Sequence, residues 1–198
     1  MKPLEPKTFQ IPELKGISAK TIEEHLKLYQ GYVKNANLIT DHLAKFGVEG
    51  DVHSYEIAEL HRKFSFEYNG IKNHEYYFEQ LEGGSLALAA SSPLVQKVTE
   101  QWNSWEAMIT HIKTIAATTR GIGWMILYYD RERKILMTTW VDEQHLGHLN
   151  SCQFIFGIDM WEHSYVADYL PSGKKQYVED YLTNVNWSVA EKRYQECL

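Results

Sequence analysis

An aspartate and a histidine lie four residues apart in the segment Asp-Met-Trp-Glu-His at residues 159–163. On a helix, or where a strand runs into a helix, this spacing can direct a carboxylate and an imidazole at one point. These two groups together suit iron, manganese or zinc better than calcium or magnesium. Because such pairs are also common on helix surfaces, Asp159 and His163 indicate a metal site only if other ligands join them.

Two long amphipathic helices are predicted in the first half of the chain. The first opens at Ser18 or Thr21, where a capping residue precedes apolar residues at helical spacing. The second ends at the Gly-Gly pair of residues 83–84, since glycine commonly terminates a helix. A turn containing Gly47 and Gly50 joins them. This arrangement predicts an antiparallel hairpin that buries its apolar stripe against the rest of the chain.

Two further candidate ligands, His25 and His74, lie on the apolar stripes of these helices. The hairpin could therefore present two imidazoles to Asp159 and His163. Three histidines and one carboxylate, with solvent as a fifth ligand, would suit a redox-active iron or manganese ion. Five other histidines are interpreted as ordinary core or surface residues: His42, His53, His61, His111 and His148.

The second half of the chain changes from helical to strand periodicity. One helix is predicted over residues 94–117, three strands over residues 124–129, 134–140 and 153–158, and two or three short helices after residue 160. The Gly- and Pro-containing segment at residues 83–93 separates the two halves. We therefore predict an α+β protein, with a helical-hairpin domain (residues 1–88) and an α/β domain (residues 89–198) that contains a three-stranded antiparallel sheet.

Composition limits the possible partners and location. The chain has 198 residues, of which 44% are hydrophobic and 23% charged, as is typical of a soluble globular protein. A net charge of -6 argues against general nucleic-acid binding, and no apolar run is long enough to span a membrane. Cys152 and Cys197 form no spaced framework, and residues 1–12 carry Lys, Glu and Pro without an apolar run, so no signal peptide is expected. These features predict a reducing, cytoplasmic location.

The segment at residues 159–165, Asp-Met-Trp-Glu-His-Ser-Tyr, closely resembles a signature of the iron/manganese superoxide dismutase family. Four other segments agree with this family in the same order, at residues 18–37, 73–78, 121–124 and 184–187. The resemblance extends over nearly the whole chain. It implies the predicted fold and an oxidoreductase that converts superoxide anion into oxygen and hydrogen peroxide. It also implies one redox-cycling manganese or iron ion per subunit.

The resemblance assigns the metal ligands to four matched positions, which are His25, His74, Asp159 and His163. Tyr32 matches the family's gateway tyrosine. Gln144 matches an active-site amide that is expected to donate to solvent at the metal and to accept from Tyr32. These two residues are the candidate catalytic residues.

Further residues match positions that surround the metal in the family. Trp124 and Trp161 would form apolar walls of the site. Glu162 matches the acid that hydrogen-bonds a ligand histidine of the partner subunit, which implies a homodimer through the region of Glu162 and His163. Lys27 and Lys174 are candidates for guiding the anionic substrate.

The chain departs from the family near its first ligand. The spacing between His25 and Tyr32 is one residue shorter than usual, so alignment backwards from Tyr32 would place Glu24 at the ligand position. The upstream match Ser-Ala-x-Thr-Ile-Glu and the neutral charge of imidazole favour His25. The shortening also removes a histidine that the family carries near Tyr32, leaving Leu28 and Tyr29 there. Val166 replaces the usual tyrosine partner of that histidine.

The metal preference and the function have alternatives. Gly70 lies where some iron enzymes supply the active-site glutamine, and Gly157 resembles manganese-preferring members, so manganese is favoured, with use of both metals possible. A non-haem iron oxygenase would also use histidine and carboxylate ligands, but usually on a many-stranded barrel. A metal-free interaction protein of the same fold would be favoured if a ligand were lost, and none is lost when His25 is the first ligand.

Overall fold

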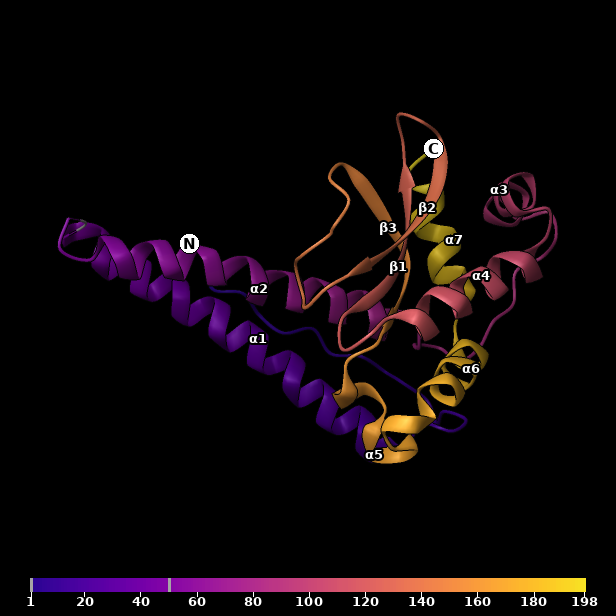
Figure 1. Ribbon diagram of the computed structural model, residues 1–198, viewed down its shortest axis with the longest axis horizontal. Helices are drawn as coiled ribbons and strands as arrows, with labels where there is room; N and C mark the ends of the chain where they lie inside the picture. The colour runs from indigo at the N-terminus through magenta and orange to yellow at the C-terminus, as the bar shows by residue number, and fades with distance from the viewer. Residues whose placement is uncertain (1, 50) are drawn as a thin grey trace.

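The computed structural model describes residues 2–49 and 51–198. Helices α1 (Ala19–Phe46) and α2 (Ser54–Glu79) form a long antiparallel hairpin whose tip projects away from the rest of the molecule (Figure 1). Ser18 opens α1, because its hydroxyl accepts a hydrogen bond from the Thr21 backbone N–H. The predicted hairpin is confirmed. The turn begins with the 3-10 helix η1 (Gly47–Glu49), and Gly50 lies outside the described residues.

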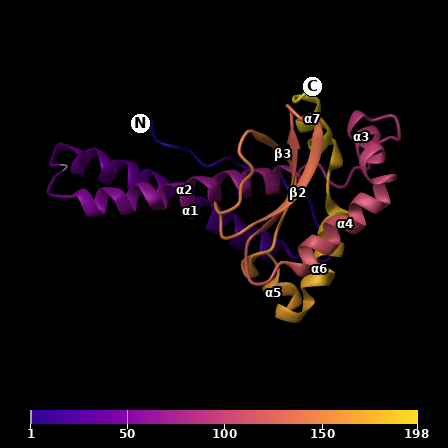
Figure 2. The ribbon, with the colours of Figure 1, turned by 45° about the horizontal axis from the view of Figure 1, so that its top comes forward.

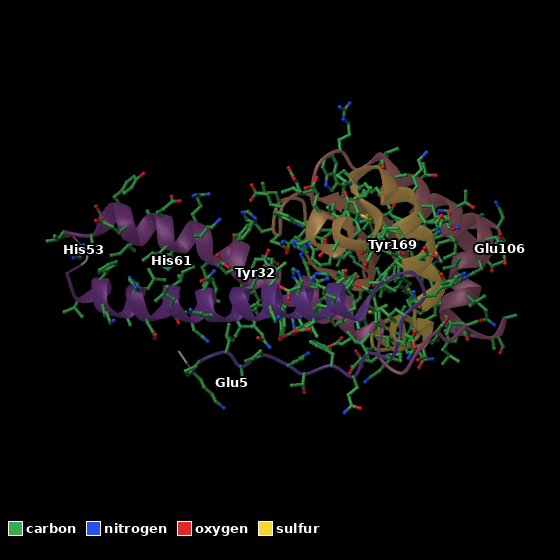
Figure 3. All side chains as sticks on the ribbon, turned by 90° about the horizontal axis from the view of Figure 1, so that it is seen from below. Glu5, Tyr32, His53, His61, Glu106 and Tyr169 are labelled. Atoms are coloured by element: carbon green, nitrogen blue, oxygen red, sulfur yellow. The ribbon has the colours of Figure 1, made fainter. Side chains whose placement is uncertain are left out.

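The N-terminal segment runs in extended form along the hairpin, and Glu5 in Figure 3 marks its course beside α1. The Asn37 side chain of α1 accepts from the Leu4 backbone N–H at 2.8 Å and donates to the Leu4 carbonyl at 2.9 Å. The Tyr29 hydroxyl accepts from the Lys7 backbone N–H at 2.8 Å. These bonds pair backbone groups of Leu4 and Lys7 in a segment that has no regular structure of its own.

The predicted three-stranded antiparallel sheet is also confirmed. Strands β1 (Trp124–Asp130), β2 (Ile135–Val141) and β3 (Cys152–Asp159) are arranged in the order β2-β1-β3. At the edge of β3, the Gln80 side chain that follows α2 accepts from the Gly157 N–H at 3.0 Å and donates to the Gly157 carbonyl at 2.9 Å. The amide therefore takes the place of a neighbouring strand and ties the hairpin to the sheet.

The sheet stands between the hairpin and helices α3 (Pro93–Trp102) and α4 (Trp105–Thr118) in both ribbon views (Figures 1 and 2). The prediction of a single helix over residues 94–117 was wrong. Asn103 adopts φ 69°, and the Ser104 hydroxyl caps α4 by accepting from the Ala107 N–H. Asparagine tolerates the left-handed conformation better than most residues, so it can end one helix without a glycine or proline.

The chain after β3 consists of short helices, as predicted. They are η2 (Glu162–Ser164), α5 (Val166–Tyr169), η3 (Pro171–Gly173), α6 (Lys174–Asn184) and α7 (Trp187–Gln195). Helix α7 packs on β3, α6 packs on α4, and η2 contacts α1. In the part of the chain that the structure describes, every helix is too short or too polar to cross a membrane.

Candidate metal centre

Four side chains from both halves of the chain converge at the base of the hairpin. The Nε2 atoms of three histidines surround Oδ2 of Asp159, at 3.1 Å for His25, 3.1 Å for His163 and 3.6 Å for His74. The four potential ligand atoms all lie within 4.8 Å of one another. All four residues are buried except His163, whose side chain is 18% exposed. The structure thus brings together the four ligand candidates that the sequence singled out.

The end of β3 positions two of these side chains. Asp159 pairs with Trp124 as the last residue of the strand, and the chain then turns into η2. The Trp161 N–H donates to Asp159 Oδ1 at 2.8 Å, and the Ser164 hydroxyl donates to the Asp159 carbonyl at 3.0 Å. These bonds fix the turn, which brings His163 back over the carboxylate four residues later.

The two alternatives for the first ligand have different surroundings. His25 is fully buried and faces Asp159. Glu24 is exposed and forms an ion pair with Lys27 at 2.9 Å. The geometry therefore favours His25 over Glu24, because only its side chain lies within the cluster.

The protonation states in the cluster suit a bound cation. His74 Nδ1 lies 2.6 Å from the Gly70 carbonyl, which can only accept, so Nδ1 carries the proton of the neutral ring. Burial lowers the pKa of His25 and His74, which favours neutral imidazoles. Burial alone would raise the pKa of Asp159, but His163 and the hydrogen bonds with His163 and His25 hold it well below its usual range.

One specific observation supports the fit of a metal ion to this arrangement. His74 Nε2 is buried and has no hydrogen-bond partner among the described residues. Its lone pair faces the Asp159 carboxylate oxygen at 3.6 Å, so two electron-rich atoms oppose each other. A cation between them would turn this repulsion into attraction, and imidazole and carboxylate are suitable donors for a transition metal.

Tyr32 and Gln144 lie in one hydrogen-bonded chain beside the cluster. Trp124 Nε1 donates to Gln144 Oε1 at 2.9 Å, and Gln144 Nε2 donates to the Tyr32 hydroxyl at 2.9 Å. The expectation that the amide accepts from Tyr32 was wrong. Indole nitrogen can only donate, so Trp124 occupies the amide oxygen and leaves the amide nitrogen for Tyr32. The Tyr32 ring lies 5.0 Å from the His74 ring.

A surface hollow of about 400 Å³ leads to Tyr32 and is called the entrance hollow below. It is lined by Glu24, Lys27, Leu28, Gly31, Tyr32, Asn35, Phe66 and Glu67. In Figure 3, Tyr32 lies where the hairpin meets the bulk of the molecule. Lys27 is at the rim of this hollow, but Glu23 and Glu24 pair with it at 2.8 and 2.9 Å. Lys174 instead donates to the carbonyls of Thr119 and Gly121.

The remaining residues named from the sequence lie close to the cluster. The ring of Trp124 lies 5.0 Å from that of His74, and the ring of Trp161 lies 5.7 Å from that of His163. Glu162 is exposed beside His163. The two tryptophans thus cover faces of the cluster, whereas Glu162 points to the outside of this chain.

Sequence reasoning missed the contacts of Asn73 and Glu67. The Asn73 side chain donates to the Gln144 carbonyl at 3.0 Å. Glu67 is buried in the wall of the entrance hollow, and its Oε2 has no partner in the described chain. Burial raises the pKa of Glu67. An acid three residues from Gly70 on α2 was the available signal, but only the packing of α1 on α2 shows that it is buried.

A buried cluster of three imidazoles and one carboxylate, held between a helical hairpin and a three-stranded sheet, is typical of mononuclear non-haem metalloproteins. Residues 90–193 match the family model described as iron/manganese superoxide dismutases, C-terminal domain. The chain belongs to the iron/manganese superoxide dismutase family. The predicted resemblance is therefore confirmed, and neither the oxygenase nor the metal-free alternative gains support.

Individual relatives agree with this assignment. The chain is 33% identical to an iron superoxide dismutase of Tetrahymena pyriformis, and the match covers 88% of this chain and 89% of that protein. It is 30% identical to an iron superoxide dismutase of Saccharolobus solfataricus, with coverage of 98% and 94%. It is 29% identical to a mitochondrial manganese superoxide dismutase of Glossina morsitans morsitans, with coverage of 92% and 84%.

Proposed function

We propose that His25, His74, Asp159 and His163 bind one manganese or iron ion and form the catalytic site of this superoxide dismutase. The observation that carries the proposal is the unpartnered Nε2 of His74 opposite the Asp159 carboxylate. When bound, the ion would supply the one-electron redox chemistry that the dismutation of superoxide requires. Three imidazole ligands and one carboxylate would neutralise only part of the charge of a divalent or trivalent ion, so the loaded site would keep a net positive charge that favours an anionic substrate.

Tyr32 and Gln144 are proposed to manage the protons that peroxide formation consumes. The Tyr32 oxygen accepts from Gln144, so its own hydroxyl proton is free to be donated toward the reacting oxygen. Burial, and then the charge of Asp159, raise the pKa of Tyr32, so the hydroxyl keeps its proton at neutral pH. Tyr32 lines the entrance hollow, through which solvent can restore a proton that has been donated.

Manganese is the proposed preferred metal. Gln144 Nε2 carries a second hydrogen beyond the one donated to Tyr32, and this hydrogen can bond solvent at the metal. A strong donor there stabilises the oxidised state and lowers the reduction potential, which suits manganese because its intrinsic potential is higher than that of iron. Protein loaded separately with each metal should show more activity per bound manganese than per bound iron. Activity with iron alone would refute this preference.

A homodimer is proposed through the region of Glu162 and His163. Glu162 is exposed, and the adjacent His163 side chain remains 18% exposed at the edge of an otherwise buried cluster. A partner carboxylate that hydrogen-bonds this histidine would complete its surroundings. Glu162→Ala should weaken association in sedimentation and reduce activity together. A wild-type monomer with full activity would contradict the proposal.

A cytoplasmic location is also proposed. Cys152 and Cys197 are both free thiols in the structure, as expected of a protein in a reducing compartment. Cell fractionation with tagged protein would measure the location, and recovery from an oxidising compartment would contradict it.

The ligand assignment has a direct test in metal content. Purified wild-type protein should hold roughly one manganese or iron ion per chain, and Asp159→Ala should lose it. Glu24→Ala is the matched control for His25→Ala, because the two residues are adjacent but only His25 faces the cluster. Loss of metal in Glu24→Ala with retention in His25→Ala would show that the ligand had been assigned to the wrong residue.

A further inference from the structure

Gln144 lies at the centre of a closed turn between β2 and β3. The Asp142 N–H donates to the Leu146 carbonyl at 2.8 Å, and the Leu146 N–H donates to the Asp142 carbonyl at 3.1 Å. Glu143 adopts φ 49° within this turn, and Gly147 adopts φ 100° immediately after it. Such a turn holds its own shape, but these bonds do not fix its position relative to the metal cluster.

Three side chains hold the turn from outside: Trp161 Nε1 donates to the Glu143 carbonyl at 3.1 Å, and two others donate to the backbone carbonyl of Gln144. One is Asn73 of α2, whose Nδ2 lies 3.0 Å from the carbonyl oxygen. The other is His148, whose Nε2 also lies 3.0 Å from it. A carbonyl can only accept, so the neutral His148 ring carries its proton on Nε2 and presents the lone pair of Nδ1 on its other side.

Tyr128 occupies that other side of the ring. Its hydroxyl lies 2.5 Å from His148 Nδ1 and donates to it. Tyr128 is a buried residue of β1, at the point where a bulge shifts the pairing of β1 with β3 between Leu127 and Tyr128. Bulges commonly redirect a side chain. The bonds therefore run from a rigid strand through His148 to the peptide of Gln144.

We infer that His148 is a positioning residue that sets the placement of the Gln144 amide, an inference that rests on the proposed role of Gln144. The amide makes two side-chain bonds at once, with Trp124 and with Tyr32, each at 2.9 Å. Hydrogen bonds weaken steeply with small departures from such lengths and angles. Without His148, only Asn73 would hold the Gln144 carbonyl from outside the turn among the residues that the structure describes.

His148 lies away from the entrance hollow, so a change of this residue would act by positioning Gln144 and not by contact with the substrate. His148 and Tyr128 line a second hollow of about 440 Å³, whose lining residues include none of those that line the entrance hollow. Neither residue belongs to the cluster of ligand candidates. A change at His148 can therefore reach the reaction through the Gln144 peptide without altering the lining of the entrance hollow.

The test compares His148→Leu, which removes the donor, with His148→Gln, whose amide nitrogen can reach the same carbonyl. In metal-loaded protein, His148→Leu should lower kcat roughly two- to tenfold, the effect of one hydrogen bond, and His148→Gln should restore most of it. The reduction potential of the bound metal should move in the direction produced by Gln144→Ala. Tyr128→Phe should give a smaller change of the same sign.

A double-mutant cycle completes the test. In a Gln144→Ala background, His148→Leu should have little further effect on kcat or on the potential, because the amide that it positions is gone. An equal effect in both backgrounds, or an unchanged potential in folded His148→Leu, would overturn the inference. If His148→Leu does not fold, failure of folded His148→Gln to retain the wild-type potential would also overturn it. A wild type without dismutase activity would instead refute the proposed function.

Discussion

Gly70→Ala should disturb Tyr32, although the same change normally stabilises a helix. Gly70 lies inside α2, where alanine is favoured over glycine by about 0.5–1 kcal/mol. A Cβ at this position, however, would lie 2.5 Å from Cδ1 and 2.8 Å from Cε1 of the Tyr32 ring. Comfortable carbon contacts are about 3.5–4.0 Å, so the ring must retreat by roughly 1 Å.

The retreat has a structural and a functional cost. Overpacking costs about 1–3 kcal/mol, and loss of the 2.9 Å bond from Gln144 to Tyr32 costs about 1 kcal/mol more. After the gain in helix propensity, the net loss is about 1–3 kcal/mol, or a fall in Tm of roughly 2–12 °C. Activity per bound metal should fall roughly three- to tenfold, because the Tyr32 hydroxyl moves out of hydrogen-bonding distance of the Gln144 amide that orients it.

Gly31→Ala is the matched control. Gly31 lies inside α1, and a Cβ there would meet nothing within 4 Å. This variant should gain about 0.5–1 kcal/mol and raise Tm by roughly 1–4 °C. Calorimetry and a dismutase assay on both metal-loaded variants measure the contrast. If Gly70→Ala is as stable as Gly31→Ala and fully active, the contact with Tyr32 does not constrain the site.

Three further changes have defined outcomes. Gln80→Leu should leave the Gly157 N–H without its acceptor and lower Tm by roughly 2–12 °C in a thermal melt, and an unchanged Tm would show that the bonds between Gln80 and Gly157 do not stabilise the fold. Glu67→Gln should stabilise the protein at neutral pH. Burial raises the folded-state pKa of Glu67, so its contribution is most favourable below the unfolded pKa and is lost as pH rises through the folded value. Denaturant titrations between about pH 4 and about pH 8 should show the variant's advantage growing with pH, and a constant difference would refute this. Ser18→Ala should remove the cap of α1 and cost about 1 kcal/mol by the same titration, whereas no loss would show that the cap is replaceable.

The hairpin and the strands were predictable because their signals are local. Apolar residues at helical spacing marked both long helices, and short apolar runs between turn residues marked β1, β2 and β3. The break between α3 and α4 was missed because it depends on the left-handed conformation of Asn103. Asparagine also occurs inside helices, so the residue type alone does not locate such a break.

The candidate ligands were predictable from motif and periodicity, whereas the bonds around Gln144 were not. His25 and His74 lie on apolar stripes of the predicted helices. Asp159 and His163 occur in a segment that resembles a signature of the superoxide dismutase family. The direction of the Gln144 amide depends on Trp124, which is twenty residues away in the chain. The role of His148 likewise depends on how the turn closes. Periodicity carries no information about contacts of this kind, since they are made by side chains of separate elements.

The candidate metal cluster depends on one of the contacts that join the two halves of the fold. His25 and His74 come from the hairpin, while Asp159 ends a strand whose outer edge has no neighbouring strand in the described sheet. Gln80 bonds both backbone groups of Gly157, two residues before Asp159. The bond pair therefore fixes the carboxylate relative to the two imidazoles, and it does so without using a ligand. Because backbone groups at a buried strand edge must be paired, the requirement that stabilises the sheet also sets the geometry of the candidate metal site.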